Sequence, residues 1–514
     1  MKNNNTESQS NRQIVFGGMI SYGIIGLNIL LGLIYTPWIL RTVGSSQYGL
    51  YTLASSLIAL FLQDFGMSAA VTRFIAVYRA KDDNLGINQV FTIVVKLYFG
   101  IMVVVAIILF FVFLNLTTIY SNLEPAELET FKGVFAITSF CVVICFPVNV
   151  CNGVLNAYEE FIALKLSDVI NRLGTVLVTF IALSANGGIY ALIIISGVIN
   201  IITFIVKLVI MHRRTSVQFI PRYFDGTKLK EIATFSVWST VSSIAQQMIF
   251  NIMPTILAMT LNTAAITMYG FANVIEGYVS TITGAINGLF LPKISRVVKD
   301  DKDASGILPL MIRVGRINQS IVSLLFMGVL FTGEKFIGLW LGSEYTDVYY
   351  CMVMLIVPYC ISSSLQIASS SVIAMNQIHY SAIINICTGV FNLISAYLLA
   401  PRFGVIGVCA CISATYILRT LFNLVVYVEV LHINLGKFFI NCHIKMIPGL
   451  FLSAGVSYFI IRFGIGHITH SLGWIGFLMD ACTVSIVYVV IMWFFGWNDG
   501  EKNMFYSLIK RRKA

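Results

Sequence analysis

Long apolar runs alternate with short polar segments along almost the whole chain. The runs begin at residue 14 and end near residue 496, and clusters of Gly, Pro and charged residues separate them. A hydrocarbon core about 30 Å thick is crossed by roughly 20 apolar residues of helix. The pattern therefore predicts fourteen membrane-spanning helices, near 14–40, 48–78, 88–114, 131–157, 166–184, 189–211, 231–261, 266–292, 309–333, 348–375, 381–400, 405–430, 441–464 and 473–496.

Composition supports an all-α polytopic membrane protein. Of the 514 residues, 58% are hydrophobic and only 11% are charged, against about 25% charged in soluble domains. The first apolar run, Ile14 to Leu40, is longer than the apolar part of a cleavable signal peptide, so we expect it to remain as the first span.

The sequence offers little for catalysis or for a metal. The ten cysteines lie mostly inside apolar runs and form no CxxC pair, and His467 with His470 is too small a set for a metal site. No GxxxxGK[ST] motif is present, so the chain has no ATPase of its own. We expect no cofactor, no metal and no enzymatic activity, and the net charge of +10 has no soluble domain that could bind nucleic acid.

Basic residues predict the orientation. Most of the 33 Lys and Arg residues fall in loops on the side that holds both chain ends, including His212–Lys230 and the tail Lys510–Lys513. Because basic loops remain on the cytoplasmic side, we expect both termini to be cytoplasmic.

An internal repeat divides the chain. Residues 37–40 (PWIL) resemble 254–257 (PTIL), and Tyr48–Gly49 resembles Tyr269–Gly270, with shifts of roughly 217 to 221 positions. Because each repeat has six spans, an even number, the second copy begins on the same side of the membrane as the first. The two lobes are therefore related by a pseudo-two-fold axis along the membrane normal. The expected parts are a cytoplasmic tail (1–13), a first lobe (14–215), a second lobe (216–430), two accessory helices (431–496) and a basic cytoplasmic tail (497–514).

Several spans carry a polar stripe with the three- and four-residue steps of one helix face. The clearest runs through Asn273, Glu276 and Asn287, and others include Gln63 and either Gln246 or Gln247. In lipid such a face turns toward protein or a water-filled cavity. The alternative for any single Ser or Thr is a role in helix packing.

Charges inside the spans are the strongest candidates for function, because each costs about 2.5–3.5 kcal/mol at the helix centre. Arg419 and Glu276 lie nearest the middle of the membrane. For Lys207 we expect snorkelling to the interface, and for Arg172 an ion pair with Asp168 four residues earlier. Arginine side chains match phosphate oxygens in pairs, and Asn and Gln side chains suit the hydroxyl groups of a sugar, so the substrate suggested is a phosphate-linked glycan. The predicted binding residues are Arg73, Lys96, Arg172, Arg316, Arg419, Gln63, Asn273, Gln246 and Gln247, and the ion-coupling candidates are Glu276 and Asp64.

The segment LRTVGSSQYGLYTLASSLIALFLQDFGMSAAVTRFIA, Leu40 to Ala76, resembles the signature region of Wzx-like polysaccharide flippases of the multidrug/oligosaccharidyl-lipid/polysaccharide (MOP) exporter superfamily. The segment GLWLGSEY, Gly338 to Tyr345, resembles an external loop of that family. The resemblance implies a MATE-like V-shaped pair of lobes. It also implies alternating access that moves an undecaprenyl-diphosphate-linked oligosaccharide to the outer leaflet, for O-antigen, capsule or exopolysaccharide synthesis. Arg73 lies inside the matched segment and is implied to contact the diphosphate.

Two alternatives remain open at this point. A MATE-like drug or cation antiporter would couple transport to a proton or sodium gradient, and a peptidoglycan-precursor flippase would share the helix plan. The partners expected for the favoured hypothesis are the lipid-linked glycan, the lipid bilayer, and a polysaccharide polymerase with glycosyltransferases.

Overall fold

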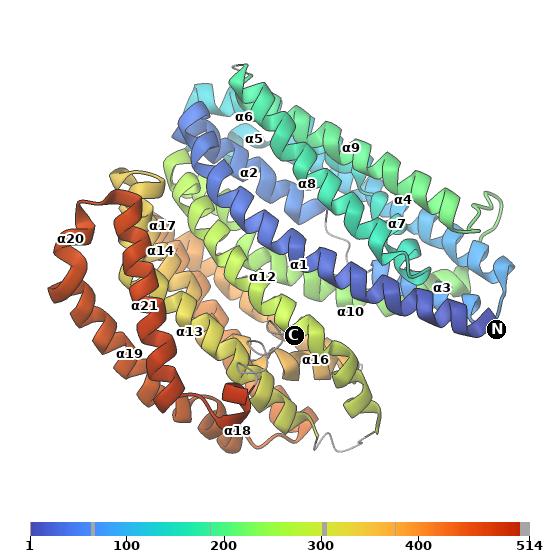
Figure 1. The fold of residues 1–514 in the computed structure, drawn as a ribbon. Coiled ribbons are helices and arrows are strands. Elements are labelled where there is room, and N and C mark those ends of the chain that lie inside the picture. The colour runs from blue at the N-terminus through green and yellow to red at the C-terminus, as the bar shows by residue number, and fades with distance from the viewer. Residues whose placement is uncertain (1, 63–66, 186, 301–305, 376, 504–514) are drawn as a thin grey trace. The chain divides into compact units, whose positions relative to one another are not determined.

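The computed structural model consists of helices joined by short turns, and no β-strand occurs among the residues it describes (Figure 1). Described are residues 2–62, 67–185, 187–300, 306–375 and 377–503, without the side chains of 2–22, 235, 236, 239, 291–293, 295, 296, 298–300 and 467. The all-helical class predicted from the apolar pattern is confirmed.

The helices form two compact units, described here separately. The first unit comprises Met1–Gly270 and Asn385–Gly404, and the second comprises Phe271–Ile384 and Val405–Ala514. Helices α10 and α11 belong to the first unit by their packing, although the repeat assigned residues 216–261 to the second lobe. The lobe boundaries drawn from the repeat stay a prediction.

The first unit contains eleven complete helices within its described residues: α1 (Lys2–Val43), α2 (Ser45–Phe61), α3 (Met67–Arg79), α4 (Asn84–Leu114), α5 (Leu116–Ile119), α6 (Pro125–Cys145), α7 (Val148–Ala157), α8 (Phe161–Ser184), α9 (Gly188–Arg214), α10 (Gly226–Phe250) and α11 (Met253–Thr260). The start of α12 (Thr263–Asp300) and the middle of α17 (Ile378–Leu431) also belong to it.

The second unit contains the remainder of α12 and α17 together with α13 (Ile307–Trp340), α14 (Thr346–Ile356), α15 (Tyr359–Ser362), α16 (Gln366–Ala374), α18 (Leu435–Cys442), α19 (Ile447–Phe459), α20 (Gly466–His470) and α21 (Gly473–Phe495). Short helical turns η1 (Ser343–Tyr345), η2 (Ser363–Leu365), η3 (Ile444–Met446) and η4 (Ile460–Ile465) connect them.

Ten helices in the described part of the chain are long and apolar enough to cross a membrane, and α10 with α11, bent by 42°, makes an eleventh candidate. The expected spans near 48–78 and 266–292 are not among them. The 54-residue α17 is interrupted at Gly404, whose φ of 62° suits glycine, so it joins two of the expected spans. The chain is therefore a multi-pass membrane protein, and the count of fourteen stays a prediction.

The first unit is held together by close helix packing. Helix α8 packs between α1 and α9, and α6 also packs on α9 (Figure 1). Helix α2 and the start of α12 approach each other at two glycines: a Cβ on Gly49 would lie 2.4 Å from the carbonyl oxygen of Thr263, and one on Gly270 would lie 2.9 Å from Cγ2 of Thr52. These are the two glycines that the internal repeat matches, and both allow a close crossing that a side chain would block.

The second unit is built around α13. Its Met311 and Val314 are fully buried in a core with residues of α16, α17 and α18. The last helices are tied to α13 by an ion pair: Nζ of Lys335 lies 2.7 Å from Oδ2 of Asp480 on α21, and Asp480 is buried. Lys335 also donates to the carbonyl of Thr469 at 2.9 Å.

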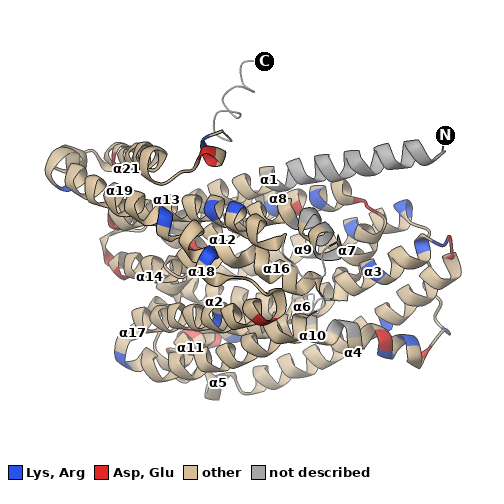
Figure 2. Ribbon diagram, turned by 90° about the horizontal axis from the view of Figure 1, so that it is seen from below, with Lys and Arg blue, Asp and Glu red and all other residues tan. Residues whose placement is uncertain are grey.

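Charged residues are few along the helices, as expected for a protein in lipid (Figure 2). Large apolar side chains are instead exposed on the outer faces of the helices, for example Phe110 and Phe111 of α4 and Phe494 of α21. In water such an exposed apolar surface would be unfavourable, whereas hydrocarbon solvates it.

The carboxyl group of Asp225, which precedes α10 outside the membrane-spanning segments, should make the stability of the protein depend on pH. Hydrogen bonds from the backbone N–H of Lys228 and of Thr227, and from the hydroxyl of Tyr223, hold the pKa of Asp225 below its ordinary value of 3.8. Because the pKa of this carboxyl group is lower in the folded than in the unfolded protein, its ionised form stabilises the fold above pH 3.8. This stabilisation is lost as the pH falls through the pKa of the folded state. Asp225→Asn keeps a capping side chain but does not titrate. Between pH 6 and pH 3 the thermal midpoint in detergent should therefore fall further for the wild type than for this variant, and equal falls would contradict the prediction.

Candidate functional site

A polar pocket opens inside the first unit, between α7, α8 and α9. It has a volume of about 260 Å³. Its polar lining consists of Asn149 and Asn152 of α7, Asp168 and Asn171 of α8, and Asn200, Thr203 and Lys207 of α9. The apolar residues Leu62, Cys145, Val148 and Phe204 complete the lining, and we call the whole cavity the first-unit polar pocket. A pocket of this size suits one small polar group rather than a whole oligosaccharide.

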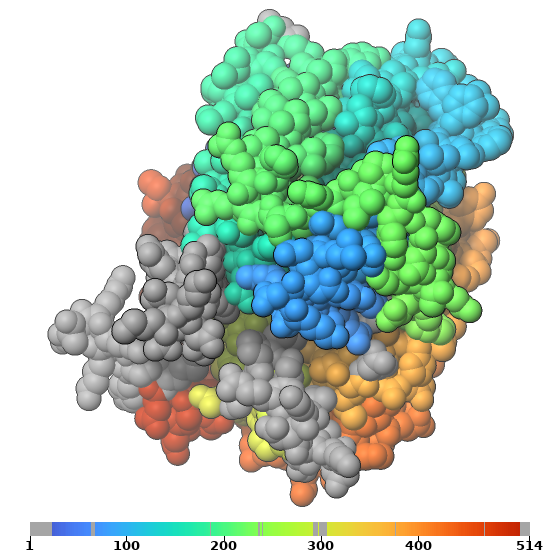
Figure 3. All heavy atoms as spheres, turned by 90° about the vertical axis from the view of Figure 1, so that its right-hand side faces the viewer, coloured from blue at the N-terminus to red at the C-terminus, as the bar shows by residue number. Residues whose placement is uncertain are grey.

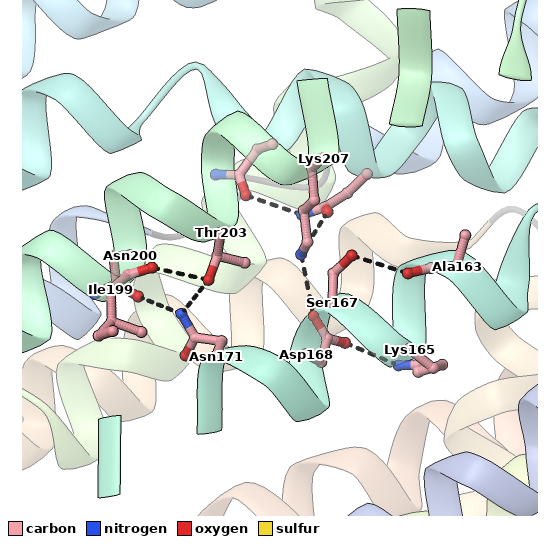
Figure 4. Close-up of polar contacts among 11 residues, drawn as sticks. Ala163, Lys165, Ser167, Asp168, Asn171, Ile199, Asn200, Thr203 and Lys207 are labelled. Atoms are coloured by element: carbon pink, nitrogen blue, oxygen red, sulfur yellow. Dashed lines mark hydrogen bonds and ion pairs between the residues drawn. The ribbon is translucent and has the colours of Figure 1, made fainter. Parts of the chain in front are cut away.

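The central contact of this pocket joins Lys207 to Asp168 (Figure 4). Nζ of Lys207 lies 3.0 Å from Oδ1 of Asp168 and 3.1 Å from Oδ1 of Asn152, and its side chain is only 9% exposed. Lys165 lies 3.6 Å from the other carboxylate oxygen. The snorkelling expected for Lys207 is therefore wrong: the ammonium turns inward because a carboxylate and an amide oxygen solvate it there.

The predicted ion pair between Asp168 and Arg172 is also wrong. Four residues place the two side chains on one helix face, but Asp168 pairs with Lys207 and Lys165. Nε of Arg172 is buried and has no hydrogen-bond partner among the described residues. Its charge instead acts on the hydroxyls of Tyr35 and Tyr51.

The amides order the rest of the pocket. Nδ2 of Asn171 donates to Oδ1 of Asn200 at 3.0 Å and to Oγ1 of Thr203 at 2.9 Å (Figure 4). Asn152 donates to Asn149 at 3.4 Å. Lys207 has three N–H donors, and two of them are used by Asp168 and Asn152. The third donates to no acceptor within the described ranges, so it is available to a ligand.

A smaller cavity of about 40 Å³ extends the polar lining toward α2. It shares Leu62, Cys145 and Asn200 with the first-unit polar pocket. Its wall includes Tyr51, on which the charge of Arg172 acts, and Thr138, a 2% exposed residue whose hydroxyl has no hydrogen-bond partner in the described part of the chain. The two cavities thus have Lys207 at one end and a tyrosine near Arg172 at the other.

The second unit contains its own charged cluster. The hydroxyl of Tyr359 donates to Oε1 of Glu276, and the ring of Tyr359 stacks on that of Tyr416 at 5.9 Å. The guanidinium of Arg419 lies 4.0 Å from the Tyr416 ring centroid, and its charge acts on Glu276. The two residues that the sequence placed nearest the membrane middle therefore lie in one cluster, on α12 and α17.

The polar stripe on α12 faces the interior of the second unit. Asn287 is buried and donates to the side chain of Gln366, and its own Oδ1 accepts from Nδ2 of Asn318 at 3.0 Å. Asn273 is half-buried on the same helix.

Arg316 anchors the end of the chain. It is 3% exposed, and its guanidinium donates to both carboxylate oxygens of Glu501 at 2.6 and 2.8 Å and to the carbonyls of Asn441 and Gly496 at 2.7 Å. Four acceptors hold it in place, so the structure gives this predicted diphosphate residue a buried packing role.

Lys96 fastens the segment that joins α9 to α10. Its Nζ donates to the carbonyls of Pro221 and Tyr223, at 2.9 and 2.8 Å. One helical turn earlier on α4, the hydroxyl of Thr92 accepts a hydrogen bond from the N–H of Ile220. A further turn earlier, Oδ1 of Asn88 accepts one from the N–H of Gln218. We call residues 215–225 the linker. In Figure 3 the linker (green) lies beside the end of α3 (blue), and Lys228 lies 5.5 Å from the ring of Tyr78 there.

Removing the Lys96 ammonium should loosen the linker on either side of Arg222. Two hydrogen bonds from a charged donor each contribute about 1.5–3 kcal/mol, so trypsin should cleave Lys96→Met after Arg222 at least about tenfold faster. Lys132→Met removes an exposed lysine of α6 and is the matched control. Equal cleavage rates in both variants would show that Lys96 does not hold the linker.

The other predicted site residues lie apart from these clusters. Arg73 is exposed on α3, and Gln246 and Gln247 are half-buried on α10, where Gln247 accepts a hydrogen bond from Asn251. Gln63 and Asp64 lie outside the described residues. No group of three or more His, Cys, Asp or Glu side chains that could hold a metal ion occurs in the described part of the chain.

Most residues of the first-unit polar pocket are not among those predicted from the sequence. Its signal was present, because Asn200, Thr203 and Lys207 follow steps of three and four on one helix face. These steps are the same as those of the polar stripe on α12, and they indicate a polar face on α9 that includes Lys207.

Comparisons with known proteins agree with this helical arrangement. A family model described as "Polysaccharide biosynthesis protein" matches residues 15–298. No curated protein sequence gives a significant match.

Solved structures of several transporters share the fold. The lipid II flippase MurJ in an inward closed conformation matches with a TM-score of 0.68 and 15% identity, over 96% of this chain and 100% of that one. A multidrug resistance MATE family transporter of the MOP superfamily matches with a TM-score of 0.63 and 13% identity, over 80% and 98%. A MOP superfamily transporter from Pyrococcus furiosus matches with a TM-score of 0.55 and 15% identity, over 83% and 96%. Since the family match covers more than half of its residues, the chain belongs to the polysaccharide biosynthesis protein family, and its fold is that of the MOP superfamily of transporters.

Proposed function

We propose that the protein is a flippase for a lipid-linked oligosaccharide. It moves an undecaprenyl-diphosphate-linked glycan from the inner to the outer leaflet by alternating access, for the synthesis of O-antigen, capsule or exopolysaccharide. It lies in the bacterial inner membrane with both termini in the cytoplasm, and it supplies a polysaccharide polymerase that uses glycans built by glycosyltransferases. Family membership supports the polysaccharide context.

The observation that carries the proposal is the charge of the first-unit polar pocket and its extension. Lys207 lines the pocket, Lys165 lies beside it at 3.6 Å from Asp168, and Arg172 acts on Tyr51 in the wall of the smaller cavity, whereas Asp168 is the one carboxylate among the lining residues. An excess of positive charge in and beside the cavities favours an anion, and a diphosphate provides one with several acceptor oxygens. The asparagine amides suit the hydroxyl groups of the adjoining sugar.

The same pocket argues against a drug or cation antiporter. A cation would need the carboxylate of Asp168, but Lys207 already lies 3.0 Å from it. An ammonium tethered to the chain neutralises the carboxylate and repels a second cation. Glu276, with Arg419 near it, and Asp64 stay candidates for coupling to a proton or sodium gradient. Likewise Arg73, Lys96, Arg316, Arg419, Gln63, Asn273, Gln246 and Gln247 stay proposed contacts of the substrate.

Deleting the gene tests the class of function. A strain without the protein should accumulate lipid-linked glycan in the inner leaflet and lose surface polysaccharide, and the wild-type gene should restore both. Normal surface polysaccharide in the deletion strain would refute the proposal. Loss of drug resistance as the sole phenotype would favour the antiporter.

A further inference from the structure

An apolar groove on the outer surface of the first unit has no part in the proposed transport site. It has a volume of about 370 Å³ and lies between α4, the junction of α6 and α7, and α9. Every side chain that lines it is a hydrocarbon, an aromatic ring, a methionine or a cysteine. We propose that this groove binds an acyl chain of an anionic phospholipid, whose headgroup is held by Arg213, Arg214 and Arg222.

The groove opens toward the hydrocarbon of the membrane. Its wall residues Phe99 of α4 and Leu208 of α9 are 51% and 37% exposed. Next to them, the outward side chains Val103 and Ile205 are also about half exposed. A lipid chain therefore reaches the groove directly from the bilayer, and it gains contacts on three sides that a flat helix surface does not offer.

The linker closes one end of the groove. Phe219 lines the groove from the linker, and the residues on either side of it are fixed: Gln218 donates to Asn88 at 2.8 Å, and Ile220 donates to Thr92 at 2.9 Å. Lys96 holds the next residue, Pro221. The phenyl ring is therefore held over the groove by backbone hydrogen bonds to α4.

A basic rim adjoins the same end. Arg213 and Arg214 follow the groove residue Met211 on α9, and Arg222 follows Phe219 by three residues. All three arginines are exposed, and none forms an ion pair with an acidic side chain in the described ranges. Clusters of basic residues beside a span attract anionic headgroups, and guanidinium groups match phosphate oxygens in pairs.

The arrangement favours a bilayer phospholipid over the lipid tail of the transported glycan. Among the lining residues of the groove only Phe204 also lines the first-unit polar pocket, and no polar side chain of that pocket lines the groove. A lipid with its headgroup in the pocket would have to pass the Phe204 ring to place its chain in the groove. The occupant's headgroup therefore lies at the basic rim, and its binding does not depend on the proposed function.

Native mass spectrometry of the purified full-length protein tests the inference, with phosphatidylglycerol or phosphatidylcholine added at equal concentrations. The wild type should retain phosphatidylglycerol at least about tenfold better. Leu208→Trp fills the groove and should lower retention of both lipids, whereas Ile205→Trp, on the same helix but outside the groove, should retain them normally. Changing Arg213, Arg214 and Arg222 together to Gln should reduce retention of phosphatidylglycerol to that of phosphatidylcholine.

Three results would overturn the inference. The first is equal retention of the two lipids by the wild type, and the second is an unchanged preference in the triple Gln variant. The third is a polyprenyl phosphate that displaces phosphatidylglycerol from the wild type but not from Leu208→Trp, because it would identify the groove as a site for the substrate's tail.

Discussion

Arg316→Ala is expected to lower the free energy of unfolding by about 3–5 kcal/mol, because it removes one partner of a buried ion pair. Glu501 would keep its charge beside Asn441 and Gly496 without the guanidinium that now lies 2.6 Å from its carboxylate. The residues after α21 should then detach from α13. Thermal unfolding in detergent measures the stability, and proteolysis of the C-terminal tail measures the detachment.

A matched control lies one helical turn earlier. Arg313 is exposed on the same helix, so Arg313→Ala should change stability by less than about 0.5 kcal/mol. Combining Arg316→Met with Glu501→Leu removes both charges and should recover most of the loss. If Arg316→Ala unfolds at the wild-type temperature but abolishes export, Arg316 acts on the substrate and its packing role is secondary.

Lys207→Met should reduce glycan export by about ten- to a hundredfold. A hydrogen bond to a charged group contributes about 1.5–3 kcal/mol, and each 1.4 kcal/mol is a factor of ten in binding. Stability should change much less, because Asp168 is 37% exposed and retains Lys165. The measurement is surface polysaccharide together with accumulated lipid-linked glycan, at equal amounts of protein in the membrane.

Lys165→Met separates substrate binding from the ion pair. Lys165 approaches the same carboxylate at 3.6 Å but is itself 38% exposed, so export should stay within about twofold of the wild type. Lys207→Arg keeps the charge and should restore part of the export. Equal export by Lys207→Met and the wild type would remove Lys207 from the site.

The fold class followed from the apolar pattern alone, because the length of a membrane span imposes its own period on the sequence. The pattern also predicted the buried face of α12, where Glu276, Thr283 and Asn287 follow the steps of one helix face. It gave no sign of the 42° bend between α10 and α11, since such a bend depends on how neighbouring helices satisfy the freed backbone groups.

Contacts between side chains on different helices are harder to predict from the sequence than the buried face of a single helix. Asp168 was assigned to Arg172 on its own helix, whereas α9 supplies Lys207 at 3.0 Å. Arg316 finds its acceptor 185 residues away in sequence. A single sequence gives the spacing along one helix, but the contacts between helices depend on packing that the spacing does not encode. For the same reason the spacing of Asn88, Thr92 and Lys96 along α4 does not predict that these side chains hold the linker.

Binding of undecaprenyl diphosphate and of uncharged undecaprenol to the purified protein tests the central claim most directly. The account predicts that the wild type binds the diphosphate at least about tenfold more tightly than the alcohol, and that Lys207→Met combined with Arg172→Gln reduces this preference to less than about twofold. A preference that is unchanged in the double variant, or absent in the wild type, would contradict a diphosphate site in the first-unit polar pocket.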